Sequence, residues 1–89
     1  MSVELQKRQL AVALHYDKKG APRVVAKGRG VVGQNIIEAA RQHGVPIEQN
    51  PALAEALSQV ELEHEIPEAL YRAVAEVLMF ILRVSGRLK

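Results

Sequence analysis

The residues with the clearest potential for chemistry are a run of glycines, Gly28-Arg29-Gly30-Val31-Val32-Gly33, which spells G-x-G-x-x-G. The run follows a predicted strand and opens a predicted helix, and Glu48 stands at the end of the next expected strand. In dinucleotide-binding folds such a loop holds the pyrophosphate, and an acidic residue about 20 positions further on binds the ribose. A small nucleotide- or phosphate-binding protein that uses Gly28, Gly30, Gly33 and Glu48 is therefore one hypothesis.

The length of the chain argues against that hypothesis. A dinucleotide-binding domain is built on a six-stranded sheet, and 89 residues leave no room for one. Glycines at this place also have a structural role, because each can relieve a tight backbone or let a helix approach the sheet. We therefore expect these glycines to be structural and the protein to bind no cofactor.

Other chemical groupings in the sequence are weaker. His64 lies between Glu63 and Glu65, but three consecutive residues of a loop cannot all turn toward one metal ion. We find no Ser-His-Asp order and no pair of carboxylates that can be placed in a cleft, so we expect no enzyme activity and no metal site. The three aromatic residues are too few to stack nucleic-acid bases: Tyr16, Tyr71 and Phe80.

The elements that position these residues can be predicted from periodicity. Residues 10–16 and 23–27 read as two strands of a hairpin, and a helical pattern runs from Gly30 to His43. Residues 45–48 read as a short strand, expected to lie parallel to 23–28 because a helix connects them. Two more helices, 50–59 and 66–84, each begin at a proline. The predicted core stripes are Val31, Val32, Ile36, Ile37 and Ala40 in the first helix, and Leu70, Val74, Val77, Leu78 and Ile81 in the last.

Composition indicates one small globular domain. Apolar residues make up 48% of the chain and charged residues 25%, cysteine is absent, and the net charge is +2. Residues 1–30 carry seven basic and two acidic side chains, whereas residues 31–70 carry seven acidic and one basic. This asymmetry indicates either a solvated surface or a basic face for an acidic partner, a phosphate or anionic lipid. Without a signal peptide or a membrane span, we expect a cytoplasmic protein.

Several blocks of the sequence also match one family of secretion proteins, in the family's order and at nearly its spacing. The chain resembles the C-terminal cytoplasmic domain of the flagellar export protein FlhB and its counterparts in virulence type III secretion systems. The resemblance covers roughly residues 9–84, and flagellar export is the better fit of the two. The blocks that carry it are residues 10–17, 21–28, 45–47, 50–54, 65–71 and 73–78.

The resemblance implies an α/β fold, with a small mixed β-sheet of three or four strands flanked by about three helices. We expect a disordered N-terminus at 1–8, a single domain at 9–85 and a frayed tail at 86–89. FlhB carries its domain after transmembrane helices, which are missing here, so the chain looks like a free-standing relative of the domain.

The family's self-cleaving tetrapeptide, Asn-Pro-Thr-His, is replaced here by Gln6-Lys7-Arg8-Gln9. In the family, the asparagine amide attacks its own carbonyl to form a five-membered succinimide. Gln6 would need a six-membered ring, and Gln9 cannot move protons as an imidazole does. We expect no self-cleavage, and a chain that mimics the product already cut at this point.

The resemblance also implies a binding surface. In the family, exported substrates present a short apolar motif to a shallow pocket between the hairpin loop and the last helix, and the matching positions here are Ala21, Pro22, Ala75 and Leu78. From the periodicity alone, Ala75 and Leu78 could equally be core. The expected function is a non-enzymatic interaction module of type III export. Its expected partners are export substrates, the hook-length control protein or export-gate proteins, with a possible peripheral contact to the membrane export apparatus and no nucleic acid.

Overall fold

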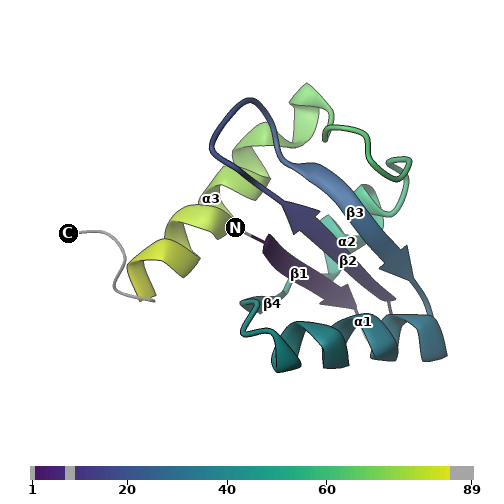
Figure 1. The fold of residues 1–89 in the computed structure, drawn as a ribbon. Helices are drawn as coiled ribbons and strands as arrows, with labels where there is room; N and C mark the ends of the chain where they lie inside the picture. Colours follow the sequence, from purple (N-terminus) through teal and green to yellow (C-terminus); the bar gives the residue numbers. More distant parts are fainter. Residues whose placement is uncertain (1, 8–9, 85–89) are drawn as a thin grey trace.

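The computed structural model describes residues 2–7 and 10–84, with side chains described over 10–81. The described residues form three strands, a helix, a fourth strand and two further helices, in that order along the chain (Figure 1). A 3-10 turn, η1, leads into the last helix. The elements are β1 (Ser2–Lys7), β2 (Leu10–His15), β3 (Arg23–Gly28), α1 (Val31–Gln42), β4 (Ile47–Gln49), α2 (Pro51–Leu57), η1 (Glu68–Leu70) and α3 (Tyr71–Val84).

The four strands form one mixed sheet in the order β3-β2-β1-β4. β2 pairs antiparallel with both β1 and β3, whereas β4 runs parallel to β1. The predicted small mixed sheet is therefore confirmed, but the predicted neighbour of the 45–48 strand is wrong. β4 lies at the opposite edge of the sheet from β3. Its neighbour is β1, a strand that the sequence prediction left out.

The N-terminal segment corrects a second expectation. Residues 2–7 are not disordered: they form β1, paired with β2 from Ser2 opposite His15 to Lys7 opposite Leu10. Their order has a simple cause, because the segment lies between β2 and β4 and its backbone groups are paired on both sides. Residues 1, 8 and 85–89, where the other expectations for the termini fall, lie outside the described residues.

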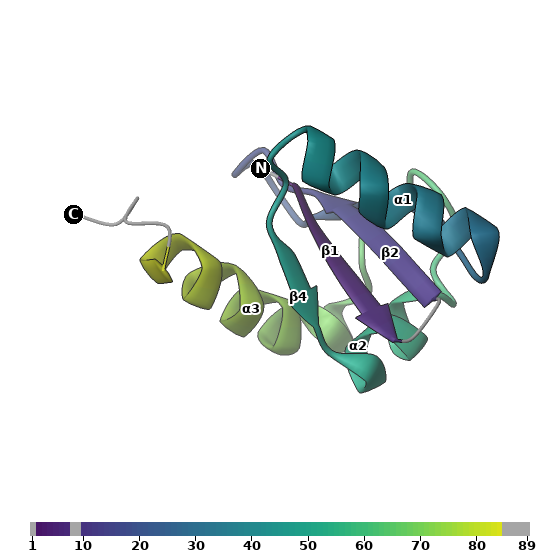
Figure 2. The ribbon, with the colours of Figure 1, turned by 90° about the horizontal axis from the view of Figure 1, so that it is seen from below.

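Helix α1 covers one face of the sheet, and α2 and α3 cover the other (Figure 2). On α1 the residues that face the sheet are Gly33, Ile37 and Ala40. The predicted stripe is wrong at its start, since Val31 and Val32 are 71% and 54% exposed. Gly33 lets the helix backbone approach the sheet, so the inward face is centred one residue later than the valines suggested.

The main core lies between the sheet and helices α2 and α3. Helix α2 begins as predicted, with the Asn50 side chain accepting a hydrogen bond from the Leu53 N–H and Pro51 in the first turn. The predicted stripe of α3 is confirmed, since Leu70 packs against the core and the other four members are buried. The buried core residues on this side are Leu10, Val12, Leu14, Val24, Leu53, Ala54, Leu57, Ile66, Val74, Val77, Leu78 and Ile81. Among the described residues, no helix is long and apolar enough to cross a membrane.

Candidate functional site

The site begins at the loop that joins β2 to β3. The loop closes with Asp17, whose carboxylate accepts a hydrogen bond from the Lys19 N–H (2.9 Å), and with two residues at positive φ, Lys18 and Gly20. Short polar side chains and glycine allow such a turn, because glycine reaches positive φ without a steric cost. The chain then returns through Ala21 and Pro22 into β3.

A second segment, residues 63–66, is fixed against the return of this loop. The Ile66 N–H donates to the Pro22 carbonyl (2.9 Å), and the Val24 N–H donates to the His64 carbonyl (3.1 Å). The Glu63 N–H donates to the Val24 carbonyl (2.7 Å). These three bonds extend the edge of β3 and hold the start of the C-terminal helical segment beside the hairpin loop.

Helix α3 therefore passes close to the hairpin loop in its first two turns. Pro67, in an extended conformation, precedes η1, and Tyr71 is the first residue of α3. Because helical residues three and four apart share a face, Val74, Ala75 and Leu78 lie on the turns that pass the loop. Val74 and Leu78 are buried in the core, whereas Ala75 is exposed.

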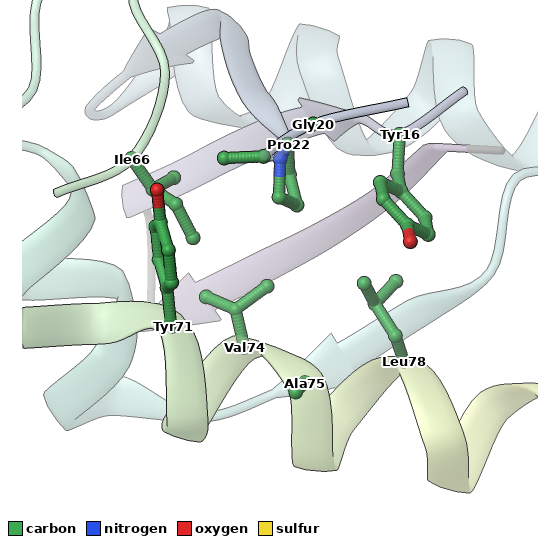
Figure 3. A pocket seen from close by; sticks show the side chains of 9 residues that line it. Tyr16, Gly20, Pro22, Ile66, Tyr71, Val74, Ala75 and Leu78 are labelled. Atoms are coloured by element: carbon green, nitrogen blue, oxygen red, sulfur yellow. The ribbon is translucent and has the colours of Figure 1, made fainter. Parts of the chain in front are cut away.

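Between the loop and the helix lies a hollow of about 310 Å³. Figure 3 shows Pro22 and Gly20 on one side and Val74, Ala75 and Leu78 on the other. Small side chains at positions 20, 21 and 75 leave this space unfilled. We call it the α3 hollow. Its lining residues are Tyr16, Gly20, Ala21, Pro22, Ile66, Tyr71, Val74, Ala75 and Leu78.

The four residues expected at a peptide pocket all line the α3 hollow: Ala21, Pro22, Ala75 and Leu78. The structure thus brings together two short stretches that are distant in the sequence. Their role in binding stays a prediction. The other five lining residues were missed, and of these Ile66 and Val74 could have been placed from the family blocks and the helical period. Tyr16 and Tyr71 also stand in matching blocks, at 10–17 and 65–71, but no pattern in the sequence indicates that their rings reach the hollow.

The chemistry of the hollow is that of an apolar receptor. Apart from the two tyrosines, every lining side chain is aliphatic or absent. Polar groups occur at the rim, where the Glu65 carboxylate stands beside Gly20. A site of this kind buries an apolar side chain and offers few groups that could fix a polar ligand. No serine, threonine, cysteine or lysine side chain lines it.

The glycine motif does not form the site expected for a dinucleotide. Gly28 ends β3, Gly30 precedes α1 with φ 63°, and Gly33 is buried in the helix. Glu48 lies in β4, which is separated from β3 by two strands. The acidic residue of a dinucleotide site follows the strand next to the glycine loop. The fold therefore separates Glu48 from the glycines, because β1 and β2 lie between.

The remaining sequence candidates are scattered. Within the described part of the chain, no three His or acidic side chains gather as a metal site would require. His64 is exposed and lies 3.7 Å from the Glu61 carboxylate, and the His43 ring lies 2.8 Å from the carbonyl of Ala39. Both contacts are local to one loop or one helix end.

The position of the missing tetrapeptide corrects one further expectation. Gln6 and Lys7 belong to β1, opposite Ala11 and Leu10 of β2, while residues 8 and 9 lie outside the described range. The strand β1 therefore begins before this position, runs into it and is paired in the sheet. The expectation that the chain mimics the second fragment of a cut protein is wrong, because β1 is the part that such a fragment would lack.

The sequence is similar to those of one family of secretion proteins. The sequence profile of the FlhB, HrpN, YscU and SpaS family matches residues 8–81. The protein YlqH of Bacillus subtilis is 47% identical over 81 residues, which cover 89% of this chain and 87% of YlqH. The flagellar biosynthetic protein FlhB of Salmonella typhimurium is 47% identical over 74 residues, covering 80% of this chain but only 19% of FlhB. The chain thus spans most of YlqH and about a fifth of FlhB.

Solved structures with the same fold include domains of FlhB and of EscU. The cytoplasmic domain of FlhB from Shewanella putrefaciens has a TM-score of 0.85 and 38% identity, covering 90% of this chain and 69% of that domain. A variant of the EscU C-terminal domain has a TM-score of 0.82 over 88% of this chain and 75% of its own, at 22% identity. At that identity the EscU likeness concerns the fold alone. The small α/β fold expected from the sequence is therefore confirmed by structure and by comparison.

Proposed function

The chain belongs to the FlhB, HrpN, YscU and SpaS family, and from this premise we propose that it is a peptide-binding module of type III protein export. A short apolar segment of an export substrate would enter the α3 hollow. The observation that carries the proposal is the meeting of Ala21 and Pro22 with Ala75 and Leu78 around one apolar space. Substrates of flagellar export, the hook-length control protein and export-gate components are the partners proposed.

The size of the hollow sets the kind of contact. A space of about 310 Å³ is at the lower end of ligand sites, so it receives a side chain and not a folded element. Burying one Leu or Phe side chain contributes about 1.5–3 kcal/mol, and ordering a free peptide takes part of that away. We expect dissociation constants in the micromolar to millimolar range. Such weak binding suits a carrier that passes its substrate on.

The module is proposed to act without catalysis. Gln6 stands where the family has asparagine, and its side chain would have to close a six-membered ring to attack its own carbonyl. Lys7 replaces the proline and Gln9 replaces the histidine that would move protons. Binding in the α3 hollow by an uncut chain is therefore the activity that we propose. We place it on the cytoplasmic side, because the solved relative is a cytoplasmic domain of FlhB.

The test is the substitution Ala75→Glu. Ala75 lines the hollow and is exposed, so the variant should unfold cooperatively near the wild-type temperature. A carboxylate in the hollow has no partner when an apolar side chain enters, so peptide binding should be lost. Thermal melts and calorimetric or NMR titration with apolar export-signal peptides measure the two effects.

Two further variants control this experiment. Ala39→Glu makes the same change at an exposed helical position on the other side of the sheet, and it should leave binding unchanged. Val74→Asp places a carboxylate at a side chain that is 1% exposed and should unfold the domain. The proposal fails if folded Ala75→Glu binds the same peptides as tightly as wild type does.

A further inference from the structure

Two tyrosines stand at opposite ends of the α3 hollow. Figure 3 shows the Tyr16 ring beside Leu78 and the Tyr71 ring beside Ile66, with Val74 and Ala75 between them along the helix. All other lining side chains are aliphatic or glycine, so these two hydroxyls are the side-chain polar atoms of the lining. A side chain that enters the hollow would lie between the two rings.

Tyr71 forms a wall of the hollow and is not part of the core. Its residue is 45% exposed, whereas Val74, one turn further along α3, is 1% exposed. Its place is set by the backbone, because the Ile66–Pro22 hydrogen bond and the η1 turn fix where α3 begins. None of the hydrogen bonds between described residues uses the Tyr71 hydroxyl. Tyr16, by contrast, is partly buried and packs against the core.

We infer that Tyr71 is a specificity-determining residue for the apolar segment of a peptide, with Tyr16 closing the far end of the same slot. This inference rests on the proposed function. The Tyr71 ring limits the length of the slot and so decides which apolar side chain fits. Its hydroxyl hydrogen-bonds to the peptide main chain, whose N–H and C=O groups lose water above an otherwise apolar surface.

The experiment separates the ring from the hydroxyl. The probes are short Gly/Ser peptides that carry a single Leu, Phe or Trp, titrated into the whole ¹⁵N-labelled chain. Tyr71→Phe keeps the ring and should weaken binding of all three peptides alike, by about threefold to tenfold, the worth of one hydrogen bond. Tyr71→Ala opens the slot and should shift the ratio of Trp to Leu affinity about tenfold toward Trp.

Phe80→Ala is the matched control. Phe80 is an aromatic residue on the same helix with similar exposure, 53%, and it does not line the α3 hollow. The substitution should leave all three affinities and their ratio unchanged. A purely structural role of Tyr71 would lower every affinity together with the melting temperature and would not change the ratio.

The outcomes are distinguishable. If wild type binds none of the peptides, the proposed function fails, and this inference fails with it. If wild type binds but Tyr71→Ala leaves the Trp-to-Leu ratio unchanged, or Phe80→Ala shifts it equally, the inference is overturned while the pocket stands. If Tyr71→Ala lowers the melting temperature, Tyr71→Leu removes the ring with less loss of packing. The ratio of Trp to Leu affinity is then measured for that variant, with the same expected shift toward Trp.

Discussion

Gly28 is a position where the fold has no room for a side chain. A Cβ there would collide with the Val32 Cγ1 and lie 2.8 Å from the Val32 Cβ. Rotation about the Cα–Cβ bond of valine does not move its Cβ, so α1 itself would have to shift. We expect Gly28→Ala to lower the free energy of unfolding by about 1–3 kcal/mol, as overpacking does. Urea denaturation measures the change.

A second substitution tests whether the contact is the cause. In the Gly28→Ala background, Val32→Gly removes the side chain that is in the way and should recover part of the lost stability, after allowance for glycine in a helix. Gly44→Ala is a comparison variant in which backbone strain, and not a steric collision, should lower the stability. Gly44 has φ 68° with no atom near its Cβ position, so its substitution costs backbone strain without any rescue by Val32→Gly. Failure of Val32→Gly to recover stability in the Gly28→Ala protein would contradict the steric explanation.

Single residues also show what the sequence could predict at this scale. Val74 and Ala75 are neighbours, and the helical period correctly assigned Val74 to the core. The same period could not decide Ala75, since a small residue next to the stripe is compatible with a core or a hollow. Only its position opposite Ala21 and Pro22 decides it, and that position depends on backbone bonds between β3 and residues 63–66.

At the scale of elements, Lys27 joins β3 to the end of α2. Its partly buried Nζ donates to the Ser58 carbonyl (3.0 Å) and to the Val60 carbonyl (2.6 Å). These groups follow a helix C-terminus, where a positive charge is favourable. We expect Lys27→Met to lower the free energy of unfolding by about 1.5–3 kcal/mol, because hydrogen bonds to a charged group are lost and two carbonyls are left without a donor.

Arg29 provides the matched control for Lys27. It pairs with Glu55 of α2 at 3.2 Å, but the two side chains are 61% and 38% exposed. An exposed ion pair contributes about 0–1 kcal/mol, so Arg29→Met should change stability by less than Lys27→Met. Equal losses in the two variants would show that net charge, and not the Lys27 bonds, joins the strand to the helix.

The elements themselves were largely predictable, and their order in the sheet was not. Alternation and helical period located β2, β3, α1 and α3, and Asn50-Pro51 marked the start of α2. The pairing of β4 depends on β1, whose short alternation of polar and apolar residues from Ser2 to Gln6 is a strand signal that the sequence prediction did not use. β1 is stabilised by its two neighbours in the sheet, a tertiary effect that local propensity does not report.

At the scale of the whole molecule, the candidate site was half predictable. Ala21, Pro22, Ala75 and Leu78 came from the resemblance to a family, because matching blocks imply matching places in a fold. The tyrosines at the ends of the hollow were not predicted, since their directions are set where the hairpin loop, η1 and α3 meet. The glycine motif met every local criterion of a nucleotide site in the sequence. Only the strand order, which places Glu48 two strands away from the glycines, argues against that site in the fold.

We predict that the purified chain does not cut itself at the segment that joins β1 to β2. After long incubation at neutral pH its intact mass should be unchanged, because neither Gln6 nor Gln9 can carry out the family's reaction. A cut between Gln6 and Lys7 that accumulates with time would contradict the prediction.

The positive control restores the family's tetrapeptide through Gln6→Asn, Lys7→Pro, Arg8→Thr and Gln9→His. This variant should split between positions 6 and 7, which mass spectrometry under denaturing conditions detects. The two pieces should still elute together in gel filtration, because β1 pairs with β2 along its length and with β4 on its other side. If this variant stays whole, the cleavage needs more than these four residues. The lack of cleavage in the wild-type chain could then not be explained by the residues at positions 6–9.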